Sequence, residues 1–120
     1  MADLSGAWLG TYWQEGVPTR FEFTLVQGGN SISGRVLDDN YLGEANIMGE
    51  VIGRKITFTK RYLTGSRHSV KYTGTVSEDG DFMQGKWQIN YFFSGEWEAH
   101  RQDDNLTLNL EILRRQKVGV

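Results

Sequence analysis

The chain of 120 residues contains no cysteine, which excludes disulfide bonds and thiolate metal sites. Chains without cysteine are typical of a reducing compartment, so we expect a cytoplasmic protein. No apolar stretch approaches the roughly 20 residues that span a bilayer. The opening segment "MADLSGAW" lacks the basic and apolar parts of a secretory signal. We therefore expect a soluble domain without a membrane partner.

The chain has little excess charge of either sign, at −2 in total with a pI near 5.6. This argues against nucleic acid as a partner. One segment is locally basic, because residues 54–71 contain six Lys and Arg residues and no Asp or Glu. Such a segment suits an anionic ligand, RNA or an acidic protein surface, although its outward face lacks the aromatic residues that stack on bases. Alternatively, it is a solvated face that acids on neighbouring strands balance.

Motifs for catalysis and for cofactors are also lacking. The chain contains no phosphate-binding glycine loop, no nucleophile elbow and no paired Cys and His, so we predict no cofactor and no catalytic residue. The run Asp38, Asp39 and Asn40 supplies oxygen ligands of the kind that Ca²⁺ and Mg²⁺ prefer. Its spacing matches no known metal loop, and Asp and Asn are ordinary turn residues. We therefore expect no metal site.

Glycine and aromatic residues are abundant, with 15 Gly, 6 Phe, 5 Tyr and 4 Trp. Together with many Val, Ile and Thr residues, they favour antiparallel β structure. Apolar and polar residues alternate with a period of two almost throughout the chain. This alternation predicts eight strands, at 7–13, 19–27, 31–38, 44–52, 55–62, 69–76, 82–89 and 93–101.

The predicted connections alternate in character. "GGN" after Gln27, "GR" after Ile52 and "SEDG" after Val76 are tight turns, whereas "QEGVP", "DNYLG", "LTGSRH" and "NYF" are longer. A meander would place every tight turn at one end and every longer loop at the other. We therefore predict a single eight-stranded antiparallel up-and-down β-barrel over residues 1–101, with one open end.

Residues 102–120 form a C-terminal extension to this barrel. Every second residue from Leu106 to Ile112 is apolar, as in a strand: Leu106, Leu108, Leu110 and Ile112. Alternatively, Leu106, Leu110 and Leu113 share one face of a helix. Either structure must cover its own barrel or a second copy of the chain. Apolar residues on the predicted outer face also suggest a homo-oligomer that forms through this face and the tail: Leu9, Trp13, Leu37, Met48 and Ile52.

Glycine stands two residues before a large residue at seven places: Gly6/Trp8, Gly10/Tyr12, Gly34/Val36, Gly49/Val51, Gly74/Val76, Gly85/Trp87 and Gly95/Trp97. A spacing of two puts both residues on the same face of a strand. Inward-facing glycines let a sheet coil tightly and leave room for a neighbouring ring. The repeat therefore indicates curvature and core packing, or aromatic residues that line a ligand cavity, and the two are compatible.

The opening Gly6-Ala7-Trp8 and the eight-stranded meander resemble the calycin group of lipocalins, fatty-acid-binding proteins and avidins. The resemblance covers residues 5–101 and implies a barrel that binds a small molecule. It also implies that Arg101 packs over Trp8, as a basic residue after the last strand does in lipocalins. The lipocalin cysteines and secretion signal are absent, and "LGTYWQEGVP" lacks the small polar residues with which avidins bind biotin. The resemblance therefore implies the fold, and not biotin binding.

Lys60 is unusual because the period of two places it on the inward face of its strand, together with Ile56, Phe58 and Tyr62. A buried lysine needs a partner or loses its charge. In one interpretation, Lys60 holds a carboxylate or carbonyl group of a ligand. In the other, its stem packs on aromatic rings and its ammonium group reaches solvent or a structural acid.

These patterns give a first hypothesis, in which the barrel mouth binds a small apolar, amphipathic or anionic ligand. Its rim would be Trp13, Tyr41, Lys60, Tyr62 and Tyr91, and its wall would be Tyr12, Tyr72, Trp87 and Trp97. The alternative is a protein-interaction or self-association module whose barrel is filled by its own side chains. An isomerase- or cyclase-type enzyme that uses Lys60 and a tyrosine would rest on fold analogy alone.

Overall fold

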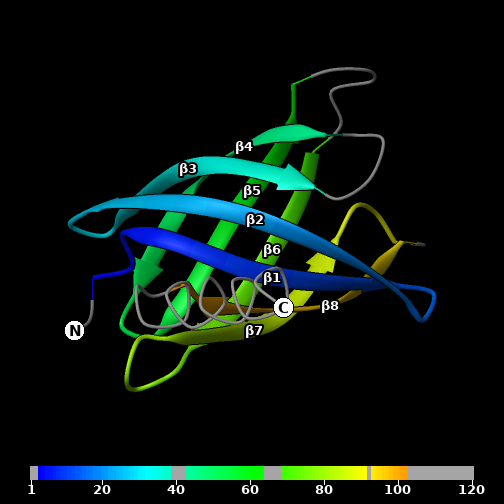
Figure 1. Ribbon diagram of the computed structural model, residues 1–120. Helices are drawn as coiled ribbons and strands as arrows, with labels where there is room; N and C mark the ends of the chain where they lie inside the picture. The colour runs from blue at the N-terminus through cyan, green and yellow to red at the C-terminus, as the bar shows by residue number, and fades with distance from the viewer. Residues whose placement is uncertain (1–2, 39–42, 64–68, 92, 103–120) are drawn as a thin grey trace, which may run out of the picture.

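The computed structural model describes residues 3–38, 43–63, 69–91 and 93–102 (Figure 1). In this part of the chain there are eight strands and no helix. The strands are β1 (Gly6–Gln14), β2 (Val17–Gly28), β3 (Ser31–Asp38), β4 (Glu44–Ile52), β5 (Lys55–Tyr62), β6 (Ser69–Val76), β7 (Phe82–Gln88) and β8 (Ser94–Arg101). Tyr41 and the extension from residue 103 onward lie outside the described residues.

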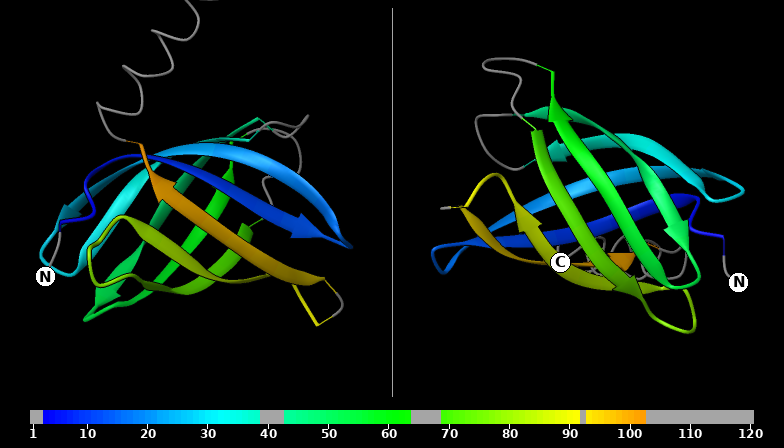
Figure 2. Two further views of the ribbon diagram at one scale, coloured as in Figure 1. Left: turned by 60° about the horizontal axis from the view of Figure 1, so that its bottom comes forward. Right: turned by 180° about the vertical axis from the view of Figure 1, so that it is seen from behind.

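The strands form a closed barrel in which each strand pairs antiparallel with the next (Figure 2). β1 closes the barrel by pairing with β8, with Gly10 opposite Ala99 and Tyr12 opposite Trp97. The predicted all-β, eight-stranded up-and-down barrel is therefore confirmed. Closure leaves no strand edge unpaired, and it defines one interior.

The connection between β1 and β2 is shorter than predicted. The "QEGVP" segment is not a long loop, because only Glu15 and Gly16 lie between the two strands. Both have positive φ, at 51° and 79°, as a two-residue type I′ hairpin requires. Pro18 fits in β2 because it has a partner on one side only. It pairs with Trp13 of β1, whereas the pairing of β2 with β3 begins at Phe21, opposite Asp38. One of the four connections at the open end is therefore a tight turn.

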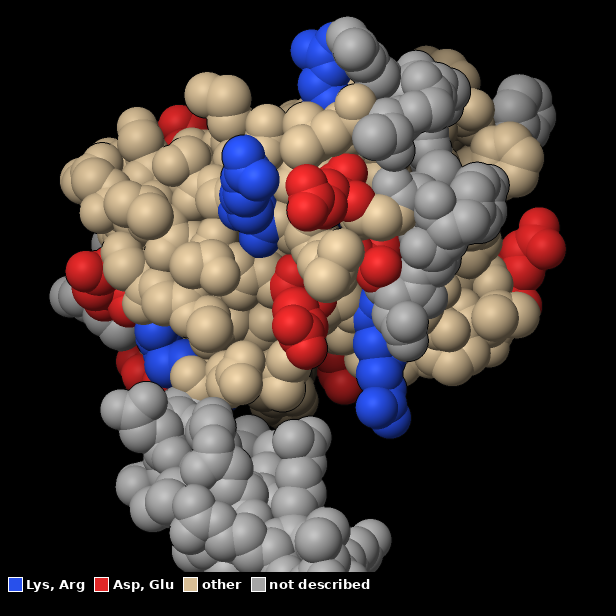
Figure 3. Space-filling view, turned by 45° about the horizontal axis from the view of Figure 1, so that its top comes forward, with Lys and Arg blue, Asp and Glu red and all other residues tan. Residues whose placement is uncertain are grey.

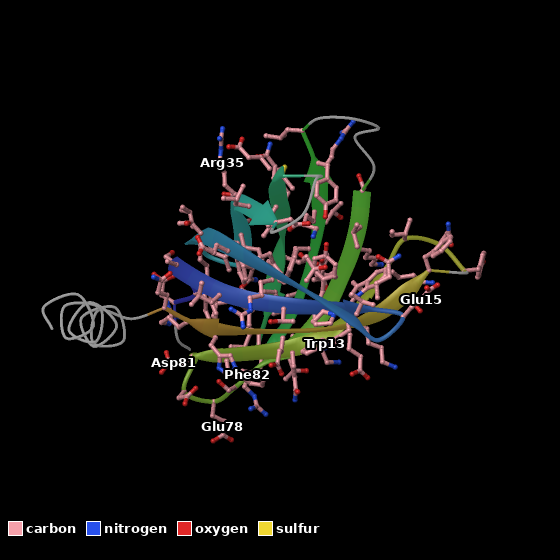
Figure 4. All side chains as sticks on the ribbon, turned by 45° about the vertical axis from the view of Figure 1, so that its right-hand side comes forward. Trp13, Glu15, Arg35, Glu78, Asp81 and Phe82 are labelled. Carbon is pink, nitrogen blue, oxygen red and sulfur yellow. The ribbon has the colours of Figure 1, made fainter. Side chains whose placement is uncertain are left out.

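The opposite, closed end carries the turns after β2 and β4 and the connection 77–81, which contains the "SEDG" turn and lies between the strand ends that we predicted. The Ser77 hydroxyl accepts a hydrogen bond from the Phe82 backbone N–H at 3.1 Å, and the Ser77 carbonyl accepts one from Gly80 at 3.0 Å. Figure 4 shows Glu78 and Asp81 at this end and Glu15 at the other.

Arg101 holds the closed end together. Its guanidinium group lies 4.6 Å from the ring of Trp8, which is the contact that the calycin resemblance implies. It also donates to the carbonyls of Asp3, Ser5 and Gly80 at 2.8–3.0 Å and forms an ion pair with Asp81 at 3.1 Å. A single guanidinium with several fixed donors thus joins the N-terminal segment, the 77–81 connection and the end of β8.

The inward glycines lie beside large side chains of the next strand. Gly10 pairs with Phe21, Gly49 with Phe58, Gly85 with Trp97 and Gly95 with Trp87. A Cβ atom on Gly10 would lie 2.5 Å from the Phe21 ring, and one on Gly95 would lie 2.6 Å from the Trp87 indole nitrogen. The rings therefore occupy the space that the missing side chains leave. Curvature and core packing explain these pairs.

Aromatic rings fill the middle of the barrel. Phe58 stacks on Tyr72 with ring centroids 4.8 Å apart, and Trp97 meets both rings edge-on at 5.5 Å. Phe21 and Phe23 stack at 5.3 Å. Such pairs contribute about 0.5–1.5 kcal/mol each beyond the burial of their area. The middle of the barrel is therefore a packed core.

The outer face is largely polar. In Figure 3, acidic and basic side chains are interspersed on one face rather than grouped by sign. Leu37, Met48 and Ile52 are exposed on the outside, as parity predicted. Single exposed apolar residues of this kind are normal for a soluble surface.

Replacing Gly85 with alanine should destabilise the barrel by about 3 kcal/mol, because overpacking against fixed backbone costs this much. The new Cβ would lie 1.8 Å from the Thr73 carbonyl oxygen and 2.5 Å from the Gly74 Cα, neither of which can rotate away. Gly28→Ala is the matched control, because no other atom lies within 4 Å of its Cβ position. Urea unfolding of both variants measures the difference, and equal losses of stability would contradict this account.

Candidate functional site

The barrel interior changes character near the open end, where polar side chains replace apolar ones. Asp38 is the last residue of β3, Lys60 and Tyr62 lie near the end of β5, and Tyr12 and Tyr72 project from β1 and β6. All five are buried. Because successive residues of a strand point to opposite faces, Asp38 follows Val36 inward and Lys60 follows Phe58. We call these five residues the polar cluster.

The centre of the polar cluster is an ion pair between Asp38 and Lys60. The Lys60 Nζ atom lies 3.3 Å from Asp38 Oδ1 and 3.2 Å from Oδ2, and the two side chains are 0% and 1% exposed. The pair forms across β4, which presents the small side chain of Ala45 between Val36 and Tyr62. A lysine this deeply buried keeps its charge only beside such a partner.

Two tyrosines complete the hydrogen bonding of the carboxylate. The hydroxyl of Tyr12 donates to Asp38 Oδ2 at 3.3 Å, and that of Tyr62 donates to the same oxygen. Among the described residues, no buried side-chain nitrogen or oxygen lacks a hydrogen-bond partner. The cost of burying the charges is thus offset by a shared set of hydrogen bonds.

Aromatic rings surround the ammonium group on its other sides. The Lys60 Nζ atom lies 4.6 Å from the ring centroid of Tyr12, 5.0 Å from that of Tyr62 and 5.2 Å from that of Tyr72. The Phe21 ring lies 5.4 Å away. The negative faces of aromatic rings attract a cation. These rings stabilise the ammonium group without replacing the hydrogen bonds that water would give it.

Burial changes the proton affinities of the polar cluster. It lowers the pKa of Lys60 to about 8, although the charge and hydrogen bonds of Asp38 oppose this shift. Burial, and then the Asp38 charge, raises the pKa of Tyr12. Burial and the hydrogen bond to Asp38 raise the pKa of Tyr62, and burial raises that of Tyr72. The tyrosines therefore stay neutral donors, while Lys60 releases its proton near pH 8, well below the pH at which an exposed lysine does.

A small cavity of about 50 Å³ opens beside Lys60 at the open end. On the measure in which one water needs about 10–15 Å³, it has room for roughly three to five water molecules. The Trp87 wall is held in place because its indole N–H donates to the Trp13 carbonyl at 3.0 Å. Four members of the polar cluster, but not Asp38, line it together with Gln14 and apolar side chains: Tyr12, Gln14, Lys60, Tyr62, Val70, Tyr72, Trp87 and Ile89.

The structure brings together five of the nine predicted site residues around this cavity: Tyr12, Lys60, Tyr62, Tyr72 and Trp87. Trp97 lies deeper, where it is 1% exposed and donates to the Thr73 carbonyl at 3.0 Å. Trp13 is half-buried and contributes its backbone carbonyl rather than its ring. Tyr91 is 96% exposed beyond the end of β7, and Tyr41 lies outside the described residues.

The sequence analysis did not identify Asp38 as the partner of Lys60. Asp38 lies two residues after Val36 and therefore points inward as Val36 does. However, Asp38 also begins a run of turn residues that suggested a metal loop. Among the described residues, no group of three His, Asp or Glu side chains is placed to hold a metal ion. Gln14, Val70 and Ile89 of the lining were also not predicted.

Exposed large side chains lie in the connection between β7 and β8, and one of them, Ile89, also lines the cavity. Ile89 and Phe93 are 41% and 45% exposed, although the period of two that turns Trp87 and Trp97 inward would also turn these two residues inward. They turn outward because β7 ends at Gln88 and β8 begins at Ser94, so neither belongs to a strand. The Ile89 backbone N–H donates to the Phe93 carbonyl at 2.9 Å, which holds the two residues side by side. We call Ile89, Tyr91 and Phe93 the apolar rim.

A larger hollow of about 260 Å³ lies at the closed end, between Leu4, Val51 and Val76. Arg54 and Glu78 border it, but both are exposed to solvent, and no buried polar side chain lines it. It therefore offers apolar contact without the fixed polar groups that orient a ligand.

No helix of the described residues is long and apolar enough to cross a membrane.

Breaking the Asp38–Lys60 pair from one side should cost about 3 kcal/mol, because a buried charge is left without its partner. We expect this loss for Lys60→Met, and a smaller loss for Asp38→Asn, which keeps an acceptor for Tyr62. The double variant should lose clearly less than the sum of the two single variants. Urea unfolding of all four proteins measures this coupling, and simple additivity would show that the two side chains do not depend on each other.

The free energy of unfolding should rise between pH 8 and about 10. In that range the unfolded chain keeps a proton on Lys60 that the folded protein has released, since burial lowers the folded pKa to about 8. Above pH 10 stability should fall, because burial beside Asp38 raises the pKa of Tyr12, Tyr62 and Tyr72, and only the unfolded chain then loses these protons. Urea titrations across this range should show the rise in the wild type and not in Asp38→Asn/Lys60→Met.

No protein-family model matches the chain, and no curated protein matches its sequence. The site therefore has to be interpreted from its own chemistry.

Proposed function

We propose that the open end of the barrel binds a small amphipathic molecule, whose polar group enters the cavity beside Lys60. The observation that carries this proposal is the position of the polar cluster. The middle of the barrel is apolar and aromatic, whereas the one buried ion pair of the described residues lies next to a cavity. A buried ion pair adds little stability compared with apolar packing. Its place beside an opening suits recognition.

The charge of the site favours a neutral polar group over a carboxylate. Lys60 and Asp38 sum to zero when both are ionised, and the tyrosines are neutral. An anionic ligand would gain from Lys60 but would meet the Asp38 carboxylate just behind it. A hydroxyl or carbonyl group can exchange hydrogen bonds with Tyr12, Gln14 and Lys60 without adding charge.

The walls favour an apolar body on the same ligand. Val70, Trp87 and Ile89 line the cavity, and Ile89 continues outward into the apolar rim. Since about 50 Å³ holds only a polar group and its first few carbons, the rest of the ligand would lie against the rim. Covering these exposed side chains would supply about 25 cal/mol per Å² of buried apolar surface.

Self-association through the outer face has less support. Leu37, Met48 and Ile52 are 54%, 72% and 59% exposed, but charged neighbours separate them. Leu37 lies between Glu22 of β2 and Glu44 of β4, and Ile52 pairs with Lys55. An obligate interface would present a more continuous apolar surface. Light scattering on the purified protein tests this alternative directly, through its molar mass.

Octan-1-ol should bind at the open end, which ¹H–¹⁵N NMR spectra can show. The indole N–H signals of Trp87 and Trp8 serve as reporters, since Trp87 lines the cavity and Trp8 lies under Arg101 at the closed end. Titration should shift the Trp87 signal and leave the Trp8 signal in place. Shifts of equal size at both ends, or none at either, would contradict a site at the open end.

Ile89→Asp should weaken octan-1-ol binding about tenfold, because a charged side chain beside the apolar chain has to be desolvated. Ile52→Asp carries the same change on the outer face of β4, where no contact with the ligand is expected. Calorimetric titration of both variants measures the difference. Equal affinities would show that the apolar rim takes no part in binding.

A further inference from the structure

We propose that Lys60 captures the carbonyl carbon of an aliphatic aldehyde as an imine, so that the barrel binds such molecules covalently and reversibly. This inference rests on the proposed binding site and names its ligand class. It starts from the position of Lys60, which lines the cavity while its side chain is 1% exposed to solvent. The cavity thus gives a small ligand access to a nucleophile that is otherwise shielded.

The surroundings of the nitrogen suit a nucleophilic amine. Imine formation requires the neutral amine, and an ordinary exposed lysine with a pKa near 10.4 supplies little of it at neutral pH. At Lys60, burial makes the neutral form far more accessible, with a pKa of about 8. The rings of Tyr12, Tyr62 and Tyr72 exclude water from the sides of the nitrogen. An alkyl chain that displaces water from the cavity beside Lys60 also favours the imine over its hydrolysis.

Asp38 is placed to handle the protons of the reaction. In the first step the Lys60 nitrogen forms a bond to the carbonyl carbon, and the C=O π electrons move to the oxygen. Asp38, 3.2 Å from Nζ, accepts a proton from the nitrogen and returns one to the oxygen, which gives a carbinolamine. The proton that the Lys60 ammonium group gave up to become the neutral amine then moves to the carbinolamine hydroxyl. The C–O bond breaks, the nitrogen lone pair forms the C=N bond, and water leaves. One aldehyde and one ammonium group thus give one protonated imine and one water, and no oxidant or reductant is consumed.

The polar cluster also suits the product. A protonated imine carries the same positive charge as the ammonium group that it replaces, so the Asp38 carboxylate would remain its counter-ion. The hydroxyls of Tyr12 and Tyr62 both donate to Asp38 Oδ2 and keep the carboxylate in position. The alkyl chain would leave past Val70 and Ile89 toward the apolar rim.

Trapping with octanal and sodium cyanoborohydride at pH 7 tests the proposal, because the reductant converts an imine to a stable secondary amine. With one equivalent of octanal, intact mass should rise by one octyl group in place of one hydrogen, and peptide mapping should place it on Lys60. We expect a yield at Lys60 about tenfold or more above that of any exposed lysine, since its neutral fraction is about a hundredfold larger. Labelling spread evenly over the lysines would overturn the proposal.

Two variants provide the controls. Asp38→Asn/Lys60→Met removes the amine together with its buried counter-charge, and circular dichroism checks that it stays folded; it should lose the adduct. Lys55→Met removes an exposed lysine of the same strand and should keep it. The octan-1-ol titration separates the two proposals, since an alcohol cannot form an imine. Binding of octan-1-ol without an octanal adduct on Lys60 would overturn covalent capture alone, whereas the absence of both would overturn the binding site as well.

Discussion

The structure depends on a steric constraint between neighbouring strands: where one strand turns a large ring into the barrel, the next presents no side chain. Gly95 and Gly85 accept Trp87 and Trp97 in this way. A Cβ on Gly85 would collide with the backbone of β6 itself, so the curvature that closes the sheet also depends on the missing atoms. Ring size and strand curvature are thus linked. A closed interior this narrow is filled by its own side chains.

The open end departs from this packing, and its chemistry follows from the departure. Asp38 and Lys60 take positions that aliphatic residues could fill, and they need Tyr12 and Tyr62 to complete their hydrogen bonding. The result is a buried pair of opposite charges that includes a lysine of lowered pKa. Such an arrangement costs stability and provides an amine whose charge changes near neutral pH. The cavity beside it makes that property available to a small molecule.

The strand bounds and the inward-facing residues could be predicted wherever the alternation of apolar and polar residues alone determines them. The ends of β3, β4, β5 and β6 agree with the sequence pattern, and so does the inward direction of Lys60. The hairpin at Glu15 was missed because a non-glycine residue adopts positive φ there, and because Pro18 resembled a loop residue. The approach of Asp38 to Lys60 was missed for a different reason. It depends on the register of three strands, with Val36 and Ala45 side by side, and no local pattern encodes this register.

The contact between Arg101 and the Ser5 carbonyl joins residues 96 positions apart, and this has a consequence for how the chain folds. The first strand cannot be paired on both sides until the last one has been synthesised, because β8 lies between β1 and β7. Until then a partly folded sheet has two open edges that can pair with other chains. Closure through such distant residues is also slow. Resistance of the nascent protein to aggregation therefore depends on how soon β8 joins.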